Sequence, residues 1–545
     1  MPTSLLHRRR VRAVALGAAL ASAGTFVLAS GAQARPDDNL ARRSAVQMLR
    51  VDTPTLASRN QLNLLGLDVT EHGGNGFLDV VAHTKADRDK LSRAGYTFTV
   101  VVADMAKAEE ERIKADKAYA AAKPPGTSGL PSGRNAYRVL ADYDTDVTSL
   151  ATTYPSQAKA ITLAHPTLEG RTVRGIEIAT DVLASDGRPT TLILGLHHAR
   201  EWPSSELAIE FAADLLKNST DPRIKNVLDN SRVVVVPVVN PDGFNVSRTL
   251  AYEMKRKNCR LTDGQLPGAG QCALGANAAL GTDPNRNYGG FWGGPGASTS
   301  LTSETYRGAG PFSEPETQNV RELISARQVT TMISNHTYSN LVLRPPGFAA
   351  GGLTPDEAIL KSLGDAMAGQ MGYTSQYGYQ LYDTTGTTED WSYFATGGLG
   401  YTFEHGTNSF HPRFSNVVDM YAGARKLAGK GARGAFLLAA ENSIDAAKHS
   451  VVQGTAPAGV TLRLKKSFTS NTWSGTIPDV LDSTMVVPTG GSYVWHVNPS
   501  TRPLTVRAGG TEFYTLTCEN PSGTVLETQS VTVARGAAIT ENLTC

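Results

Sequence analysis

The sequence predicts an α/β protein built on a mixed, mostly parallel sheet with helices on both faces, preceded by a small α+β unit and followed by a small all-β sandwich. Strand-like and helix-like segments alternate over residues 134–449, which favours a sheet covered by helices. From residue 450 onward, short alternating apolar runs are separated by Gly, Pro and Asn, a pattern typical of a sandwich. A chain of 545 residues is too long for one ordinary core, so we expect two or three domains.

The first 34 residues have the pattern of a secretory signal peptide. Four arginines within residues 8–12 precede an apolar, alanine-rich stretch at residues 13–28, and Ala32-Gln33-Ala34 predicts cleavage before Arg35. A membrane anchor is the alternative, but this apolar run is short and is interrupted by Gly and Ser. No later stretch is apolar for long enough to span a bilayer, so we expect a secreted, extracellular product with no membrane association.

Residues 35–122 predict the small α+β unit. Its expected elements are strands at residues 77–82 and 96–102, a short helix around residues 87–91 and a charged helix over residues 105–122. Residues 123–133 are rich in Pro, Gly and Ser and have linker composition. We therefore expect a linker between this unit and the α/β domain, which covers residues 134–449.

Two longer apolar runs predict strands of the main sheet. Residues 232–239 form one of them, and residues 329–334 form another that leads toward His336. A capping box at residues 354–357 predicts the start of a helix that continues to Met371. Residues 450–545 contain no cluster of residues typical of catalysis, so the role of the sandwich stays open.

A polar octapeptide, Gly-Leu-His-His-Ala-Arg-Glu-Trp at residues 195–202, is the first candidate site. It follows an apolar run at residues 191–194 that predicts a buried parallel strand, and it precedes a stretch with helical spacing of apolar residues. The octapeptide is therefore expected at the carboxyl end of a strand, where open α/β sheets bind ligands. Its His-x-x-Glu pair could hold a metal ion, although a surface histidine beside a helix-start carboxylate has the same spacing.

The net charge and the cysteines bear on two properties of the protein, namely its partners and the compartment in which it works. With 52 Lys+Arg against 50 Asp+Glu the net charge is +2, which gives no indication of a nucleic-acid partner. The four cysteines form two close pairs along the chain, which predict the disulfides Cys259–Cys272 and Cys518–Cys545 and agree with export. A cysteine-ligated metal is the competing hypothesis, but no Cys-x-x-Cys spacing occurs.

Four further segments occur in an order that one family shares. They are Asp-Pro-Asn-Arg-Asn-Tyr at residues 283–288, Ser-Asn-His-Thr-Tyr-Ser at 334–339, Tyr-Asp-Thr-Thr-Gly at 382–386 followed by Asp390-Trp391, and Tyr-Thr-Phe-Glu at 401–404. Together with the octapeptide they resemble the pancreatic-type zinc metallocarboxypeptidases over about residues 134–449. The resemblance implies a carboxypeptidase-like fold, one Zn²⁺ and hydrolysis of the C-terminal peptide bond of peptides and proteins.

The resemblance assigns the metal ligands and the base. His198, Glu201 and His336 form a two-histidine, one-carboxylate set that leaves a coordination position open. Glu404, at the end of an apolar run, is the expected general base, and the alternative for it is a solvated strand end. Asp283 is expected to hold the second ring nitrogen of His198, or else to be a simple turn aspartate.

The neighbouring His197 is expected to pack beside the metal site. Arg256 is the candidate for oxyanion stabilisation, because residues 255–258, Lys-Arg-Lys-Asn, resemble the Trp-Arg-Lys-Asn segment of the family. Lys255 departs from that pattern, so a solvated basic run is the alternative interpretation.

Further residues are assigned to the substrate. Asn285 and Arg286 are expected to bind its terminal carboxylate, Tyr382 to close over it, and Arg200 to bind farther back along the peptide. For Arg286 a structural salt bridge is the alternative. Glu389 precedes Asp-Trp, where an acid would favour a terminal Arg or Lys, unless it faces solvent and the pocket accepts apolar residues.

The resemblance also has implications for the segment before the α/β domain and for the partners of the protein. Family prosegments shield the active site until a connecting segment is cut, so residues 35–122 are a candidate prosegment and residues 123–133 its release point, and a permanent N-terminal domain is the alternative. The expected partners are peptides or proteins with a free C-terminus, and we expect a monomer. A cell-wall peptide stem as substrate and an inactive binding module are alternatives for the function.

Overall fold

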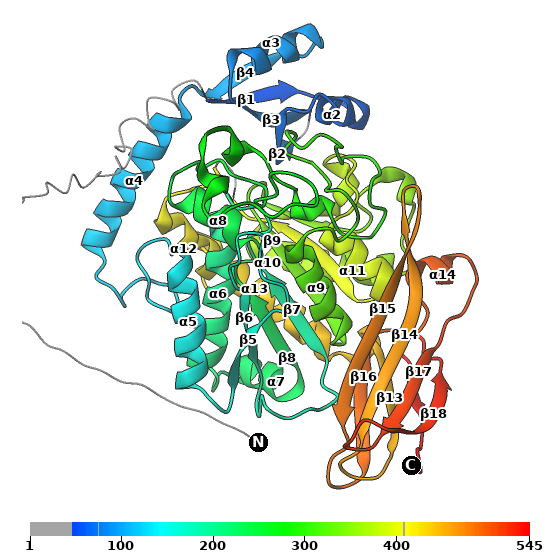
Figure 1. The fold of residues 1–545 in the computed structure, drawn as a ribbon. Helices are drawn as coiled ribbons and strands as arrows, with labels where there is room; N and C mark the ends of the chain where they lie inside the picture. The colour runs from blue at the N-terminus through cyan, green and yellow to red at the C-terminus, as the bar shows by residue number, and fades with distance from the viewer. Residues whose placement is uncertain (1–45, 75, 407–408) are drawn as a thin grey trace, which may run out of the picture.

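The computed structural model describes residues 46–545 except Asn75 and residues 407–408, so the predicted signal peptide lies outside the described residues. We call residues 46–122 the N-terminal unit, residues 134–449 the central unit and residues 450–545 the C-terminal unit. Figure 1 shows the N-terminal unit lying over one end of the central unit and the C-terminal unit running along its side. In the described part of the chain no helix is long and apolar enough to cross a membrane.

The N-terminal unit is a four-stranded antiparallel sheet with three helices. Its elements are β1 (Gln47–Asp52), α2 (Leu56–Asn63), β2 (Asp68–Gly74), β3 (Phe77–Ala82), α3 (Lys85–Arg93), β4 (Phe98–Val102) and α4 (Met105–Ala122), with strand order β2-β3-β1-β4. α3 begins at a capping box in which Thr84 and Asp87 bind each other's backbone N–H groups. Leu49, Val80 and other apolar residues of this sheet share one core with Leu341, Leu343 and Leu381 of the central unit. The N-terminal unit therefore packs its apolar face directly on the central unit.

The central unit confirms the predicted mixed sheet. Its elements are α5 (Leu140–Thr153), β5 (Ala158–Thr162), β6 (Arg174–Ile178), β7 (Thr190–Leu194), α6 (Trp202–Lys217), α7 (Pro222–Asn230), β8 (Arg232–Val236), α8 (Pro241–Arg248), α9 (Pro315–Ser325), β9 (Val329–His336), β10 (Leu341–Arg344), α10 (Glu357–Met371), β11 (Thr374–Tyr377), α11 (Thr388–Thr396), β12 (Leu399–Glu404), α12 (Phe414–Ala422) and α13 (Gly431–Ile444). The strand order is β11-β10-β12-β9-β7-β8-β6-β5, in which β11-β10, β12-β9, β9-β7 and β7-β8 are parallel pairs.

Helices cover both faces of this sheet because alternate strand residues point to opposite sides. In β7, Ile193 belongs to the core on the side of α5, α6 and α13, whereas Leu192 and Leu194 belong to the core on the side of α9 and α11. All five residues of β7 are buried, as expected for a parallel strand covered on both faces.

Several predicted boundaries differ from the structure, and the strand predicted to begin at residue 96 begins at Phe98. β8 ends at Val236 because Pro237 has no N–H group to continue the ladder, so the predicted strand over residues 232–239 is too long. The predicted capping box before α10 is also wrong, since the N-cap residue is Asp356 and it makes no side-chain cap. The Glu357 carboxylate accepts hydrogen bonds from the Arg344 guanidinium instead, at 2.8 and 3.2 Å.

The C-terminal unit consists of two sheets around one core. Its elements are β13 (Ser450–Thr455), β14 (Thr461–Thr472), β15 (Gly475–Val486), β16 (Ser492–Val497), α14 (Pro503–Arg507), β17 (Tyr514–Glu519), β18 (Val525–Val531) and β19 (Ala538–Thr540), in sheets β16-β13-β19 and β15-β14-β17-β18. Apart from the five-residue α14, this agrees with the predicted all-β sandwich. The long β14–β15 hairpin extends beyond the other strands along the central unit (Figure 1).

The segment between the N-terminal and central units is exposed at its start and packed at its end. Residues 121–127 are exposed, whereas Leu130 is buried in the core of the central unit. The backbone N–H and the hydroxyl of Ser132 both donate to the Glu210 carboxylate, at 2.8 and 2.5 Å. In the predicted linker, residues 123–127 are therefore all accessible, whereas the residues after them are partly packed against the central unit.

Candidate metal centre and active site

The predicted metal ligands and the predicted base lie together because neighbouring parallel strands have their carboxyl ends at the same edge of the sheet. His198 and Glu201 occupy the turn between β7 and α6, and His336 is the last residue of β9. Glu404 is the last residue of β12 and is paired with His336 in the parallel ladder between the two strands. Residues far apart in the sequence are thereby placed side by side at the carboxyl edge.

His198, Glu201 and His336 form a compact group. One donor atom from each side chain lies within 4.8 Å of the others, and all three side chains are buried. The Nδ1 atoms of His198 and His336 lie 2.8 and 2.9 Å from the two Glu201 oxygens and 3.1 Å from each other. Both imidazoles thus direct Nδ1 to a common point beside the carboxylate.

The second ring nitrogens of these histidines have partners of their own. His198 Nε2 lies 3.0 Å from Asp283 Oδ1, and His336 Nε2 lies 2.9 Å from Ser334 Oγ. His197 does not join the group, because its Nε2 lies 2.8 Å from Tyr288 Oη. Burial lowers the pKa of His197 well below its usual value, so this ring is neutral and supports His336, on which it stacks at 5.7 Å.

This donor set fits zinc. Two imidazoles and one carboxylate, each fixed by a further hydrogen bond, are a typical protein ligand set for a catalytic Zn²⁺. The Glu404 carboxylate is buried near the same edge, and its Oε2 atom has no hydrogen-bond partner among the described residues. Burial and the nearby Glu71 and Glu201 raise the pKa of Glu404 well above its usual range. A carboxylate in such surroundings has a high affinity for a proton.

Arg256 is buried beside the metal group. Its Nε and Nη2 atoms donate to Asp283 Oδ2 at 3.1 and 2.9 Å, so Asp283 joins Arg256 to His198. Lys255 and Lys257 are also buried, which contradicts the alternative of a solvated basic run. Both ammonium groups donate to backbone carbonyls. Lys255 donates to Leu280, and Lys257 donates to Leu301 and Ser303.

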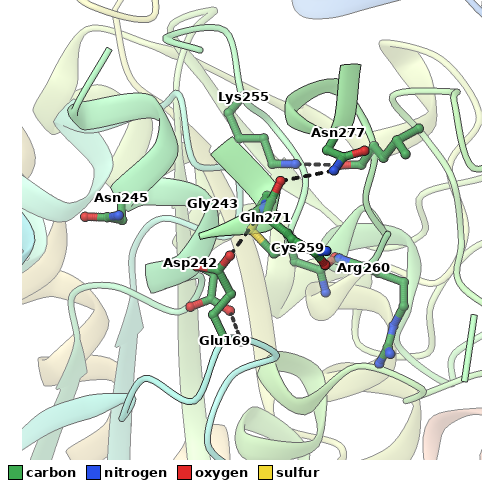
Figure 2. Close-up of a disulfide and its surroundings, with 12 residues drawn as sticks. Glu169, Asp242, Gly243, Asn245, Lys255, Cys259, Arg260, Gln271 and Asn277 are labelled. Carbon is green, nitrogen blue, oxygen red and sulfur yellow. Dashed lines mark hydrogen bonds between the residues drawn. A yellow bond between two sulfur atoms is a disulfide. The ribbon is translucent and has the colours of Figure 1, made fainter. Parts of the chain in front are cut away.

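A disulfide anchors the chain just after Arg256. Figure 2 shows Cys259 with Lys255, Arg260, Gln271 and Asn277 around it. Cys259 is bonded to Cys272, and Cys518 is bonded to Cys545, so both predicted disulfides are present. Glu169 lies close enough to the Cys259–Cys272 pair to suggest a second metal group, but disulfide sulfurs are not thiolates and do not serve as its ligands.

Two residues predicted to bind the substrate carboxylate, Asn285 and Arg286, are adjacent in the loop that precedes α9. Arg286 is buried and donates from Nη1 to the Asn285 carbonyl at 2.8 Å and from Nε to the Gly296 carbonyl at 3.0 Å. It has no carboxylate partner among the described residues, so the alternative of a structural salt bridge is not realised. Asn285 Oδ1 accepts from the backbone N–H of Thr388, the first residue of α11, at 2.9 Å.

Glu389 lies inside the site and not in solvent. It is 4% exposed, and the Thr402 hydroxyl donates to its Oε2 at 3.0 Å. A cavity of about 30 Å³ is lined by Glu389, Arg286, Tyr382, Glu404 and residues around them. Glu71 of the N-terminal unit also lines this cavity.

Two acidic residues of β2 bind arginines that the sequence analysis assigned to the substrate and to the oxyanion. Asp68 forms a bidentate ion pair with Arg200 at 2.7 and 2.8 Å, and Glu71 accepts from Arg256 Nη1 at 2.7 Å. Glu71 also lies 3.4 Å from the Tyr382 hydroxyl. The sequence analysis missed these two acids, because an Asp-Val-Thr-Glu stretch without periodicity looks like an ordinary exposed strand.

The sequence pattern of the zinc carboxypeptidase family matches residues 144–421, just over half of the chain. The chain belongs to the zinc carboxypeptidase family. Among its relatives, carboxypeptidase A1 of Mus musculus is 31% identical over 264 residues, which cover 47% of this chain and 59% of that protein. A zinc carboxypeptidase of Saccharothrix mutabilis subsp. capreolus is 29% identical over 424 residues, or 75% of this chain and 91% of that protein.

Solved structures of carboxypeptidases share the fold. Carboxypeptidase A from Helicoverpa armigera matches with a TM-score of 0.63 at 20% identity, covering 74% of this chain and 99% of that chain. The chain spans less than two thirds of the length of the mouse and rat carboxypeptidase A1 proteins that it matches. Family and fold are thereby established for the central unit.

Proposed function

We propose that this chain is a secreted, zinc-dependent carboxypeptidase that removes C-terminal residues from peptides and proteins. The observation that carries the proposal is the convergence of His198, Glu201 and His336 on one point, with Glu404 paired to His336 in the adjacent strand. The family membership and the names of the relatives support the same activity.

His198, Glu201 and His336 would hold the zinc ion. Zinc in such a set supplies a Lewis acid, which makes a carbonyl carbon more electrophilic and a water molecule more acidic. Glu404 takes a proton from the attacking water and passes it to the nitrogen of the leaving amino acid. The O–H proton thus ends on the amine, the C–N bond breaks, and the peptide gains a new C-terminal carboxylate.

Arg256 stabilises the negative charge that develops on the carbonyl oxygen. Its guanidinium is held by Asp283 at 2.9 Å and lies 3.9 Å from Glu201, which brings a permanent positive charge next to the metal ligands. Asp283 also binds His198, so one carboxylate orients both the proposed zinc ligand His198 and the guanidinium of Arg256.

Arg286, with Asn285 and Tyr382, recognises the terminal carboxylate of the substrate. Two backbone carbonyls fix the Arg286 guanidinium, which is planar and always charged and so suits a carboxylate. Recognition of a free carboxylate makes the reaction an exopeptidase reaction. Arg200 binds the peptide farther from its end.

Glu389 gives the pocket a preference for a terminal Arg or Lys. Its carboxylate is buried and receives one hydrogen bond from Thr402, so it lies in surroundings in which an opposite charge is strongly favoured. An apolar side chain in the same pocket would leave this acid without a cationic partner.

The N-terminal unit acts as an inhibitory prosegment. Asp68 and Glu71 neutralise Arg200 and Arg256, the two arginines that we assign to the substrate backbone and the oxyanion. Cleavage within the exposed residues 121–127 would release the unit, because that part of the connection is accessible. Secretion after removal of residues 1–34 would bring the enzyme to its substrates outside the cell.

The experiment is an assay of C-terminal amino-acid release by the processed, secreted protein. We expect a chelator to abolish release and Zn²⁺ to restore it, and Glu404→Gln to lower kcat by about 100-fold or more. Zinc content should stay at one per chain in Glu404→Gln, and the control Glu441→Gln, at a half-buried carboxylate that pairs with Arg223, should retain full activity. Release that persists in Glu404→Gln, or in metal-free protein, would refute the proposal.

A further inference from the structure

The β14–β15 hairpin of the C-terminal unit reaches the loop beside the substrate-binding residues. The two strands pair over their whole length, from Thr461 with Val486 to Thr472 with Gly475, which leaves Trp473 in the two-residue turn at the tip. In Figure 1 the hairpin runs up the side of the central unit toward α11. We call residues 289–297, Gly-Gly-Phe-Trp-Gly-Gly-Pro-Gly-Ala, the glycine loop.

The hairpin tip holds the glycine loop by backbone hydrogen bonds. The Phe291 N–H donates to the Asn471 carbonyl at 2.7 Å, and the Trp473 N–H donates to the Trp292 carbonyl at 2.9 Å. The Trp473 ring lies directly on the loop, since a Cβ atom added to Gly294 would be 2.5 Å from its Cε3 atom. Gly294 is therefore needed for this close approach.

The other side of the glycine loop supports the substrate site. The Gly296 carbonyl accepts the hydrogen bond from Arg286 Nε at 3.0 Å, and the Pro295 carbonyl accepts from the Thr385 hydroxyl at 2.9 Å. A Cβ atom on Gly294 would also lie 3.0 Å from Thr385 Cγ2. The glycine loop thus lies between the hairpin tip and the residue assigned to the substrate carboxylate.

Such a loop needs support from outside itself. Five of its nine residues are glycines, and glycine loses more conformational freedom on ordering than any other residue. The carbonyl that orients Arg286 belongs to one of these glycines. Without the hairpin, this part of the chain has more accessible conformations, and the guanidinium loses a fixed direction.

A second contact from the hairpin reaches the pocket wall. Asp479 of β15 has a fully buried side chain, and its Oδ2 accepts from Trp391 Nε1 at 2.9 Å. The same carboxylate accepts from Ser470 Oγ at 2.7 Å and forms an ion pair with Arg321 at 3.0 Å. Trp391 lies on α11 two residues after Glu389, so the hairpin also fixes the helix that carries the pocket acid.

We infer that Trp473 and Asp479 of the C-terminal unit are positioning residues for the substrate site: Trp473 orders the glycine loop that orients Arg286, and Asp479 fixes α11 and with it Glu389. The C-terminal unit then supports the carboxylate and side-chain pockets from behind, since none of its residues lines the cavity between Arg286 and Glu389. This inference rests on the proposed carboxypeptidase function. It concerns substrate binding and leaves the metal group and Glu404 unchanged.

The test compares variants of the full secreted chain in the same state of processing. Trp473 is 53% exposed, so Trp473→Ala should fold without a cavity. We expect Trp473→Ala and Asp479→Ala to raise KM for a peptide ending in Arg by about three- to tenfold, which corresponds to about 1 kcal/mol, with kcat within about twofold. Binding of free arginine, measured by calorimetry on the zinc-loaded protein, should weaken by a similar factor. Asp479→Asn, which keeps an acceptor for Trp391, should lie closer to wild type.

The matched control is Arg463→Ala. Arg463 pairs with Asp482 and Glu519, so its loss weakens the same sheet of the C-terminal unit without touching the hairpin tip. We expect Arg463→Ala to lower the melting temperature and leave KM unchanged. An unchanged KM and arginine affinity in Trp473→Ala would overturn the inference, as would an equal rise in KM in Arg463→Ala. Absence of release by the wild-type protein would instead refute the proposed function.

Discussion

Glu71 accepts a hydrogen bond of 2.7 Å from Arg256 Nη1, and both side chains are buried. A carboxylate of the N-terminal unit therefore already occupies the side of the guanidinium that faces the site. With Asp283 on its other nitrogens, Arg256 is bound by two carboxylates. In this state its charge is compensated, which would leave it little capacity for the oxyanion role that we propose.

The first prediction concerns latency. Replacing Asp68 and Glu71 by Ala should make the uncut chain active, because Arg200 and Arg256 become free for substrate and the buried arginines no longer hold the unit in place. We expect kcat/KM of the uncut double variant to exceed that of the uncut wild type by at least about tenfold. Release of C-terminal residues should be measured while mass spectrometry verifies that the chain is intact.

The control for this variant is Asp89→Ala, which removes an exposed ion pair with Lys85 on α3. It should leave the uncut chain latent. If the double variant stays as inactive as the uncut wild type while the cut enzyme is active, inhibition does not depend on these two acids.

The second prediction concerns the pH dependence of the stability of the uncut chain. Burial alone would raise the pKa of Asp68, but the charge of Arg200 and hydrogen bonds from His83 and Arg200 lower it below 3.8. Its stabilising contribution is present above pH 3.8 and is lost as the pH falls below that value. Burial lowers the pKa of His83, but Asp68 raises it above 6.5 overall, so the His83 contribution is complete below pH 6.5 and declines as the pH rises.

The Asp68–His83 pair should thus stabilise the uncut chain most between about pH 4 and pH 6.5. The loss of unfolding free energy caused by Asp68→Asn, measured by urea unfolding of the uncut chain, should be largest in that window and smaller at pH 8 and at pH 3. A loss that is larger at pH 8 than at pH 5.5 would contradict the assigned signs.

The third prediction concerns side-chain preference. Glu389→Gln keeps an acceptor for the Thr402 hydroxyl but removes the buried charge. We expect kcat/KM for a peptide ending in Arg to fall by about 10- to 100-fold, and kcat/KM for one ending in Leu to stay the same or rise. A wild-type enzyme that strongly prefers a terminal Phe would show that Glu389 does not select basic residues.

The fourth prediction concerns the disulfide that follows Arg256. Replacing Cys259 and Cys272 by Ser should lower the free energy of unfolding by about 2–4 kcal/mol, because a closed loop in the unfolded chain is opened. It should also lower kcat, since the Arg256 segment loses its anchor. The matched control replaces Cys518 and Cys545, and it should lower stability with no effect on kcat. Urea unfolding and initial rates measure both effects, and equal kcat losses in the two variants would contradict the role of this loop.

The fifth prediction concerns Lys255. Burial and the charge of Lys257 lower the pKa of Lys255 from 10.5 to about 7, so between these values the unfolded chain binds more protons than the folded one. The free energy of unfolding therefore rises with pH in this window. Lys255→Met should flatten that rise and stabilise the protein most at pH 6, as measured by urea unfolding from pH 6 to 10. An unchanged slope would show that Lys255 does not lose its proton on folding.

The sequence was sufficient to predict that His198, Glu201 and His336 lie together, because each of them ends or closely follows an apolar strand. His336 and Glu404 end parallel strands, so their proximity follows from the sheet once the strands are recognised. The burial of Lys255 and Lys257 could not be predicted, because their partners are backbone carbonyls that only the tertiary structure brings close. The same holds for Asp68, whose partner Arg200 lies in another unit and leaves no local pattern.

The position of Asp479 and Trp473 near the end of the chain bears on the order of events during synthesis. Strand β2, which carries Asp68 and Glu71, is synthesised before the residues assigned to zinc, and the β14–β15 hairpin is synthesised after them. If the N-terminal unit inhibits the enzyme as we propose, a nascent or prematurely terminated chain carries its inhibitor before it carries a finished specificity pocket. The cell that makes the enzyme would then be protected from it at every stage of translation.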